Sequence, residues 1–125
     1  GGNPLACTAA SAAVDLLVRE RYEVQCAEKG ARLLAGMEQV GAEFSEVIEE
    51  VRGRGLLVGV EFADADIANL VIAQLVGNNI LAAFTLNQPK VVRLEPPACI
   101  TDQEIDHVVE VFQQASVTTA EMLEL

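Results

Sequence analysis

The side chains able to carry out chemistry are few in this chain and stand far apart. It has two lysines, Lys29 and Lys90, and one histidine, His107. A lysine that forms a Schiff base needs a desolvated amine with a lowered pKa, and we expect both lysines to be solvated, one in a helix and the other in a turn. His107 precedes an apolar pair in the last predicted helix and has no nucleophile near it, which favours a surface or partly packed histidine. We therefore expect no catalytic residue in this chain.

Arg93 is the strongest candidate for a binding residue. Strand alternation places it with Val91 and Glu95 on one face of a short strand, which Pro96-Pro97 ends. A guanidinium held on a strand can bind both oxygens of a carboxylate through charge-assisted hydrogen bonds. The alternative is a surface arginine neutralised by Glu95 or another acid, and from the residues alone this alternative is favoured.

Other local patterns indicate structure rather than a site. Residues 53–55 read Gly-Arg-Gly, but no lysine followed by serine or threonine comes after them, so we expect a tight bend before a buried strand and not a phosphate loop. Glu49 and Glu50 are adjacent and point to different faces, which argues against a carboxylate pair. Three widely spaced cysteines and one histidine form no metal-ligand set. We expect buried, reduced thiols at Cys7, Cys26 and Cys99.

Composition limits the function classes. The chain has 125 residues, 51% of them hydrophobic, and a net charge of −11. Such a surface repels nucleic acid and anionic membranes, and no apolar run reaches the roughly 18 residues of a membrane span. No signal peptide opens the sequence, so we expect a cytoplasmic protein of one domain, residues 1–125. The chain begins without methionine directly at a predicted helix start, and we expect a fragment of a larger protein.

The helices and strands that must position Arg93 are predicted from the spacing of hydrophobic residues along the chain. Asn3-Pro4 predicts the start of a long helix, bent or broken, that ends near residues 40–41. Residues 44–51 are amphipathic and predict a further helical turn, whereas residues 56–62 alternate as a half-buried strand does. Asp64 or Asp66 caps a third helical segment that stops at Gly77.

The second half of the chain predicts two short strands and a closing helix. The strands cover residues 80–84 and 91–94, with a turn at residues 86–89. Thr101 and Glu104 form a capping box at the start of the last helix, and the tail after residue 116 is weakly specified. The order predicts an α+β domain, with a small sheet of about three strands and helices packed mainly on one face.

Four segments together resemble class III aminotransferases, which depend on pyridoxal phosphate. They read GGNPLAC (residues 1–7), VRGRGL (51–56), VRLEPP (92–97) and TDQEID (101–106), and their order and spacing agree across the chain. The resemblance implies the C-terminal small domain of a fold-type-I enzyme, a homodimer. Within the family the chain looks most similar to putrescine aminotransferases, with acetylornithine and ornithine aminotransferases as near neighbours. Such an enzyme moves an amino group from a diamine or amino acid, putrescine-like or ornithine-like, to an oxo acid such as 2-oxoglutarate.

The resemblance also assigns roles to residues. In this family the arginine of the R-x-x-P-P motif binds the substrate carboxylate, and Arg93 occupies that position of the motif. The resemblance therefore makes Arg93 the best candidate for a binding residue, in spite of the alternative of a surface arginine. Gly1 and Gly2 lie near the cofactor in the intact dimer. The Schiff-base lysine and the large pyridoxal-phosphate-binding domain lie upstream and are absent, so we expect this chain alone to retain no cofactor and to be inactive. Its partners are then the large domain, the second subunit and small amine and oxo-acid substrates.

A different class of function stays open. The same α+β architecture suits a free-standing interaction or assembly module with no catalytic role, because a fold of this kind carries many functions. A lysine-bearing domain immediately upstream in the reading frame favours the enzyme, and a start codon just before Gly1 favours the module.

Overall fold

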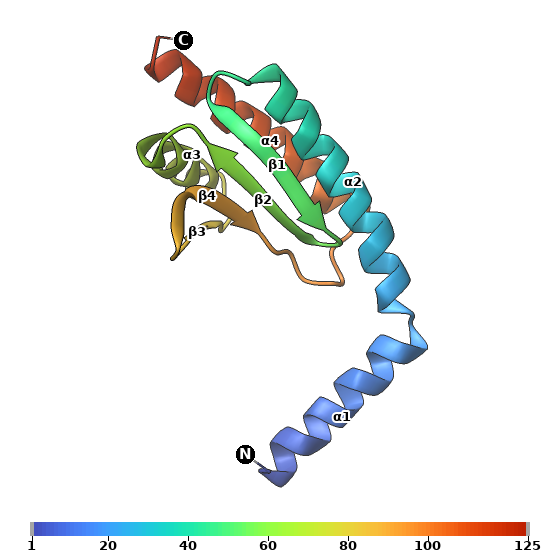
Figure 1. Ribbon diagram of the computed structural model, residues 1–125. Coiled ribbons are helices and arrows are strands. Elements are labelled where there is room, and N and C mark those ends of the chain that lie inside the picture. Colours follow the sequence, from blue (N-terminus) through green and yellow to red (C-terminus); the bar gives the residue numbers. More distant parts are fainter. Residues whose placement is uncertain (1, 125) are drawn as a thin grey trace.

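A computed structural model describes residues 2–124, which form an α+β domain of four helices and four strands (Figure 1). The helices are α1 (Pro4–Arg19), α2 (Tyr22–Glu43), α3 (Ala65–Gly77) and α4 (Asp102–Met122). The strands are β1 (Ile48–Arg54), β2 (Leu57–Phe62), β3 (Ala83–Thr85) and β4 (Gln88–Leu94). The predicted fold class is thereby confirmed. No helix in this described part of the chain is long and apolar enough to cross a membrane.

The predicted long helix is two helices with a sharp break. Asn3 caps α1, and its side chain accepts hydrogen bonds from the backbone of Leu5 and Ala6. The break lies at Arg21, whose φ of 52° is left-handed and cannot continue an α-helix. The two helices therefore point in different directions, and α1 stands away from the rest of the domain (Figure 1).

The sheet has four strands rather than about three, in the order β1-β2-β4-β3, and every neighbouring pair is antiparallel. The additional strand is β1, because residues 44–51 were expected to form a helical turn and the strand begins at Ile48. Pairing with β2 explains the difference, since it places Val51 opposite Val60 and Arg54 opposite Leu57. Hydrogen bonds and packing across strands outweigh the helical pattern of an isolated segment.

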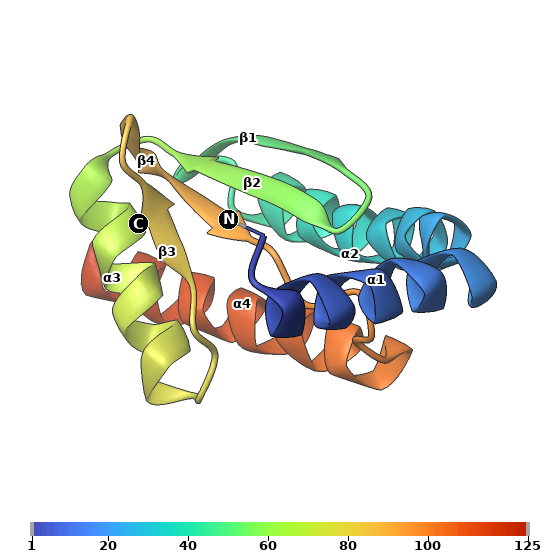
Figure 2. The same cartoon turned by 90° about the horizontal axis from the view of Figure 1, so that it is seen from below.

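The alternation predicted for residues 56–62 is confirmed and defines the two faces of the sheet. Val58, Val60 and Phe62 of β2 are completely buried beneath the helices. The ring of Phe62 stacks on that of Phe112 from α4, with the centroids 6.2 Å apart. The helices α2, α3 and α4 all lie on this side (Figure 2), so the prediction of helices mainly on one face is confirmed.

The remaining boundaries differ in detail. β3 begins at Ala83, later than the predicted residue 80, and the turn before β4 is shorter than residues 86–89 because Gln88 already belongs to β4. Asp64, one of the two expected caps, is the N-cap of α3, which ends at Gly77 as predicted. The capping box at Thr101 and Glu104 is present, and α4 continues to Met122 through the weakly specified tail.

We predict that Gly30→Ala destabilises the domain. A Cβ atom at Gly30 of α2 would lie 2.1 Å from the carbonyl carbon of Gly55, so the helix and the β1–β2 turn would have to separate. Overpacking of this kind costs roughly 1–3 kcal/mol of unfolding free energy, measurable by urea denaturation. Gly77→Ala at the end of α3 is the control, since no atom lies within 4 Å of its added Cβ. Equal stability of the two variants would contradict the close approach.

We also predict a pH-dependent contribution from the capping box. Glu104 accepts hydrogen bonds from the backbone N–H and hydroxyl of Thr101, and these bonds lower the pKa of Glu104 below its ordinary value of 4.5. A lowered folded-state pKa stabilises the protein above the unfolded pKa, and this contribution disappears as pH falls through the folded value.

Glu104→Gln, which can keep the neutral capping bonds, should therefore be less stable than the parent at pH 7. The difference should shrink as pH falls below about 4. Urea unfolding between pH 7 and 3 measures it, and a difference that does not vary with pH would count against the charge contribution.

Candidate substrate-binding face

Arg93 lies on the uncovered face of the sheet, in the middle of a row that crosses all four strands. The row is Arg52 on β1, Gly59 on β2, Arg93 on β4 and Ala83 on β3. Residues opposite each other in an antiparallel sheet point to the same face, so the two arginines stand on either side of a glycine and an alanine. Gly59 has no side chain, and the floor between the two guanidinium-bearing side chains is therefore low.

A cavity of about 410 Å³ occupies this face. Its lining combines three arginines with small and apolar residues: Arg52, Gly53, Arg54, Leu57, Gly59, Thr85, Val91 and Arg93. Three of the eight basic residues of a chain with net charge −11 are thus gathered around one depression. An arginine whose guanidinium lines such a shallow depression is suited to bind a small anion such as a carboxylate.

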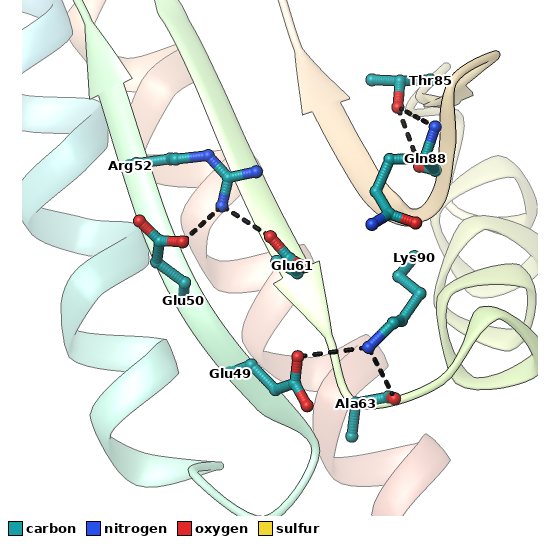
Figure 3. A network of polar contacts seen from close by, with 8 residues as sticks. All are labelled: Glu49, Glu50, Arg52, Glu61, Ala63, Thr85, Gln88 and Lys90. Carbon is teal, nitrogen blue, oxygen red and sulfur yellow. Dashed lines mark hydrogen bonds and ion pairs between the residues drawn. The ribbon is translucent and has the colours of Figure 1, made fainter.

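The three arginines differ in how they are neutralised. Arg52 donates from Nη1 to Glu50 and to Glu61, both at 2.7 Å (Figure 3), and the bond to Glu61 is the main reason that the pKa of Arg52 is raised. Arg93 Nε lies 2.7 Å from Glu95 Oε2. Arg54, at the end of β1, has no carboxylate within 4.0 Å in residues 2–124.

The sequence-predicted pairing of Arg93 with Glu95 is therefore present, and both side chains are about half exposed. Sequence reasoning missed Arg52 and Gly59 as neighbours of Arg93. The alternation of residues 56–62 already placed Gly59 on the uncovered face, but Arg52 could not be added while β1 was unrecognised.

The lysines lie away from this cavity in settings that differ from a desolvated amine. Lys90 is in β4 rather than in a turn, and its Nζ contacts Glu49 at 3.3 Å and the carbonyl of Ala63 at 3.2 Å (Figure 3). Lys29 of α2 reaches the carbonyl of Ala98 at 3.4 Å. Both are half-buried, and Lys90 is paired with a carboxylate.

The other candidate residues do not join the site. His107 is exposed on α4, and residues 2–124 contain no His, Cys, Asp or Glu group able to hold a metal ion. All three cysteines are free thiols, but Cys7 and Cys99 are exposed and Cys26 is half-buried, so the prediction of buried thiols was wrong. Gly2 is exposed with φ of 77°, and Gly1 lies outside the described residues.

Comparison with known proteins identifies the family. The family model described as Aminotransferase class-III matches residues 1–116. An ornithine aminotransferase from Toxoplasma gondii, crystallised with partial occupancy of PLP at its active site, is 32% identical, with a TM-score of 0.88 over all of this chain and 29% of its own. An ornithine aminotransferase from Plasmodium yoelii is 27% identical, with a TM-score of 0.84 over 95% of this chain and 31% of its own.

The lysine aminotransferase from M. tuberculosis shares the fold, with a TM-score of 0.79 at 22% identity. This comparison covers 84% of the present chain and 24% of the tuberculosis protein. The chain thus spans 24% to 31% of the length of these enzymes.

The residues of this chain do not by themselves fit pyridoxal phosphate. A cofactor-binding lysine needs a desolvated amine, whereas Lys90 is held by a carboxylate and a carbonyl, and Lys29 faces a carbonyl on another surface. The arginine cavity has no lysine in its lining. It could hold an anionic group, but it offers no amine for the cofactor aldehyde.

We predict that the isolated 125-residue chain retains no pyridoxal phosphate. After incubation with the cofactor and desalting, the protein fraction should show no cofactor absorbance, because Lys90 is held by Glu49 and the carbonyl of Ala63 and no lysine lines the arginine cavity. Free lysine in the same buffer is the control for reversible adducts. A cofactor band that stays with the chain, and is lost in Lys90→Ala or Lys29→Ala, would overturn this prediction.

Proposed function

The chain belongs to the class III aminotransferases, and from this premise we propose that it is the C-terminal domain of a longer, pyridoxal-phosphate-dependent transaminase. In this proposal it supplies Arg93 as the receptor for the carboxylate of an oxo acid such as 2-oxoglutarate. The donor is a diamine or an amino acid of the putrescine or ornithine kind. The cofactor is held by residues outside this chain.

The observation that carries the proposal is the position of Arg93 in the wall of the cavity on the uncovered face. Arg93 belongs to a strand with buried neighbours, Val92 and Leu94, so its backbone is fixed while its guanidinium stays accessible. Fixed backbone and accessible charge are what a carboxylate receptor requires. The names of two similar proteins, both ornithine aminotransferases, support the class of amino donor.

Two surfaces of the chain suit contact with the rest of such an enzyme. None of the sixteen residues of α1 is buried, and its large apolar side chains include Leu5 (80% exposed) and Val18 (72% exposed). An exposed apolar helix and an uncovered sheet face are typical of surfaces that a further domain or subunit covers. We propose that the large domain and the second subunit of a homodimer pack against them and leave the cavity beside Arg93 open to the substrate.

We predict that Arg93→Ala in the full-length enzyme raises the KM for 2-oxoglutarate about ten- to hundredfold, because a charge-assisted hydrogen bond contributes roughly 1.5–3 kcal/mol. The variant should fold normally, since the Arg93 side chain is half exposed. Steady-state kinetics over a range of oxo-acid concentrations measures the effect.

Arg32→Ala is the matched control. It also removes one positive charge, but Arg32 pairs with Asp106 on the helical side of the domain. It should leave the oxo-acid KM within about twofold of the parent, as for a surface change away from the site. If Arg93→Ala leaves the KM for 2-oxoglutarate unchanged, Arg93 is a surface arginine and its role as the carboxylate receptor is refuted.

A further inference from the structure

We propose that Arg54 is a specificity-determining residue that binds the second carboxylate of a dicarboxylate oxo acid, the one away from the oxo group. The inference rests on the proposed function, in which Arg93 binds a carboxylate of the acceptor. Every 2-oxo acid carries the carboxylate beside its oxo group, and that carboxylate belongs to Arg93. Arg54 then recognises what only a dicarboxylate brings, and it favours 2-oxoglutarate over oxo acids with a single carboxylate.

Arg54 is the exception among the arginines of this chain. The sequence has six arginines and 19 acidic residues. In residues 2–124 the other five each lie within 4.0 Å of a carboxylate: Arg19, Arg21, Arg32, Arg52 and Arg93. Arg54 is exposed and has no such partner in that part of the chain. In a chain with this excess of acid, a guanidinium without a carboxylate is available to an acid from outside the chain.

The backbone of Arg54 is fixed by its neighbours. Arg54 pairs with Leu57 at the end of the ladder between β1 and β2. The next residue, Gly55, packs so tightly on Gly30 of α2 that a Cβ atom at Gly30 would lie 2.1 Å from the carbonyl carbon of Gly55. A binding residue is most effective when an anchored backbone carries an accessible charge, and Arg54 combines the two.

The register of the sheet places Arg54 and Arg93 at two sides of one cavity. Both line the cavity of about 410 Å³ on the uncovered face. Arg54 lies two residues along β1 from Arg52, which shares a row with Arg93, and only β2 separates β1 from β4. Two strand spacings across the sheet and two residues along it give a Cα separation of roughly 12 Å. Two arginine side chains reaching inwards over this distance can enclose a small molecule.

The floor between the two arginines suits the carbon chain of a dicarboxylate. Leu57 and Gly59 of β2 belong to the lining of the cavity, and Leu57 is 49% exposed. The methylene groups of an oxo acid are removed from water over such a floor, while each guanidinium binds one carboxylate through charge-assisted hydrogen bonds. A monocarboxylate of the same length makes only one of these two ionic contacts, so the interaction with Arg54 distinguishes the two acids.

The test is Arg54→Gln in the full-length enzyme, assayed with 2-oxoglutarate and with 2-oxopentanoate, which has as many carbons but a single carboxylate. The kcat/KM for 2-oxoglutarate should fall about tenfold, the lower end of the range for loss of a hydrogen bond to a charged group. The kcat/KM for 2-oxopentanoate should stay within about twofold of the parent. An unchanged value for 2-oxoglutarate would overturn the proposal. An equal fall for both acids would also overturn it, because Arg54 would then act on the fold or on a contact with the rest of the enzyme.

Two further variants separate the guanidinium from its charge. Arg54→Lys keeps the charge without the planar fork, so it should restore part of the preference for 2-oxoglutarate that Arg54→Gln loses. Arg32→Gln is the matched control, because it removes one positive charge from the helical side of the domain, where Arg32 pairs with Asp106. It should leave both kcat/KM values within about twofold of the parent. If Arg32→Gln weakens 2-oxoglutarate as much as Arg54→Gln does, the effect is one of net charge, and the specific role of Arg54 is refuted.

Arg93→Ala distinguishes failure of this inference from failure of the proposed function. It should lower kcat/KM for both acids, because both carry the carboxylate beside the oxo group. If Arg93→Ala weakens neither acid, the proposed function fails. If Arg93→Ala weakens both acids and Arg54→Gln weakens neither, only the role of Arg54 fails.

Discussion

The rest of this domain depends on one constraint, the burial of every second side chain of β2. Every second residue, Val58, Val60 and Phe62, is completely buried against the helices, and burial of each such side chain stabilises the fold by roughly 1.5–3 kcal/mol. A slip of one residue in the pairing of β2 would turn these side chains outwards, so the register with β1 and β4 is firmly fixed. Because the register is fixed, so is the row in which Arg52, Gly59 and Arg93 lie.

How much could be predicted from the sequence depended on whether a signal was local. The cap at Asn3, the capping box at Thr101 and the alternation of β2 are each specified by residues within a few positions of one another, and all three are present. β1 is different, because its residues carry a helix-like pattern and become a strand only through pairing with β2. The break at Arg21 likewise had no glycine or proline to announce it.

The candidate site was predictable only in part for the same reason. Arg93 stood out because its strand and the following prolines are local features, and because the motif around it resembles a family. The cavity around it is assembled from β1, β2, β3 and β4, so its lining depends on the order of strands in the sheet. The part of the site that required this topology, Arg52 and the open floor at Gly59, was therefore not visible in the sequence.

The arginines on the two sides of the sheet differ in how they are paired with carboxylates. On the helical side, Arg32 is bound to Asp106, and the same bond lowers the pKa of Asp106 and raises that of Arg32. On the uncovered face, Arg52 has two carboxylates, Arg93 has one, and Arg54 has none within 4.0 Å among the described residues. Three of the eight basic side chains of this acidic chain thus line the cavity beside Arg93. In the proposed function, a carboxylate that reaches this face meets a guanidinium whose backbone is fixed by the buried side of β4.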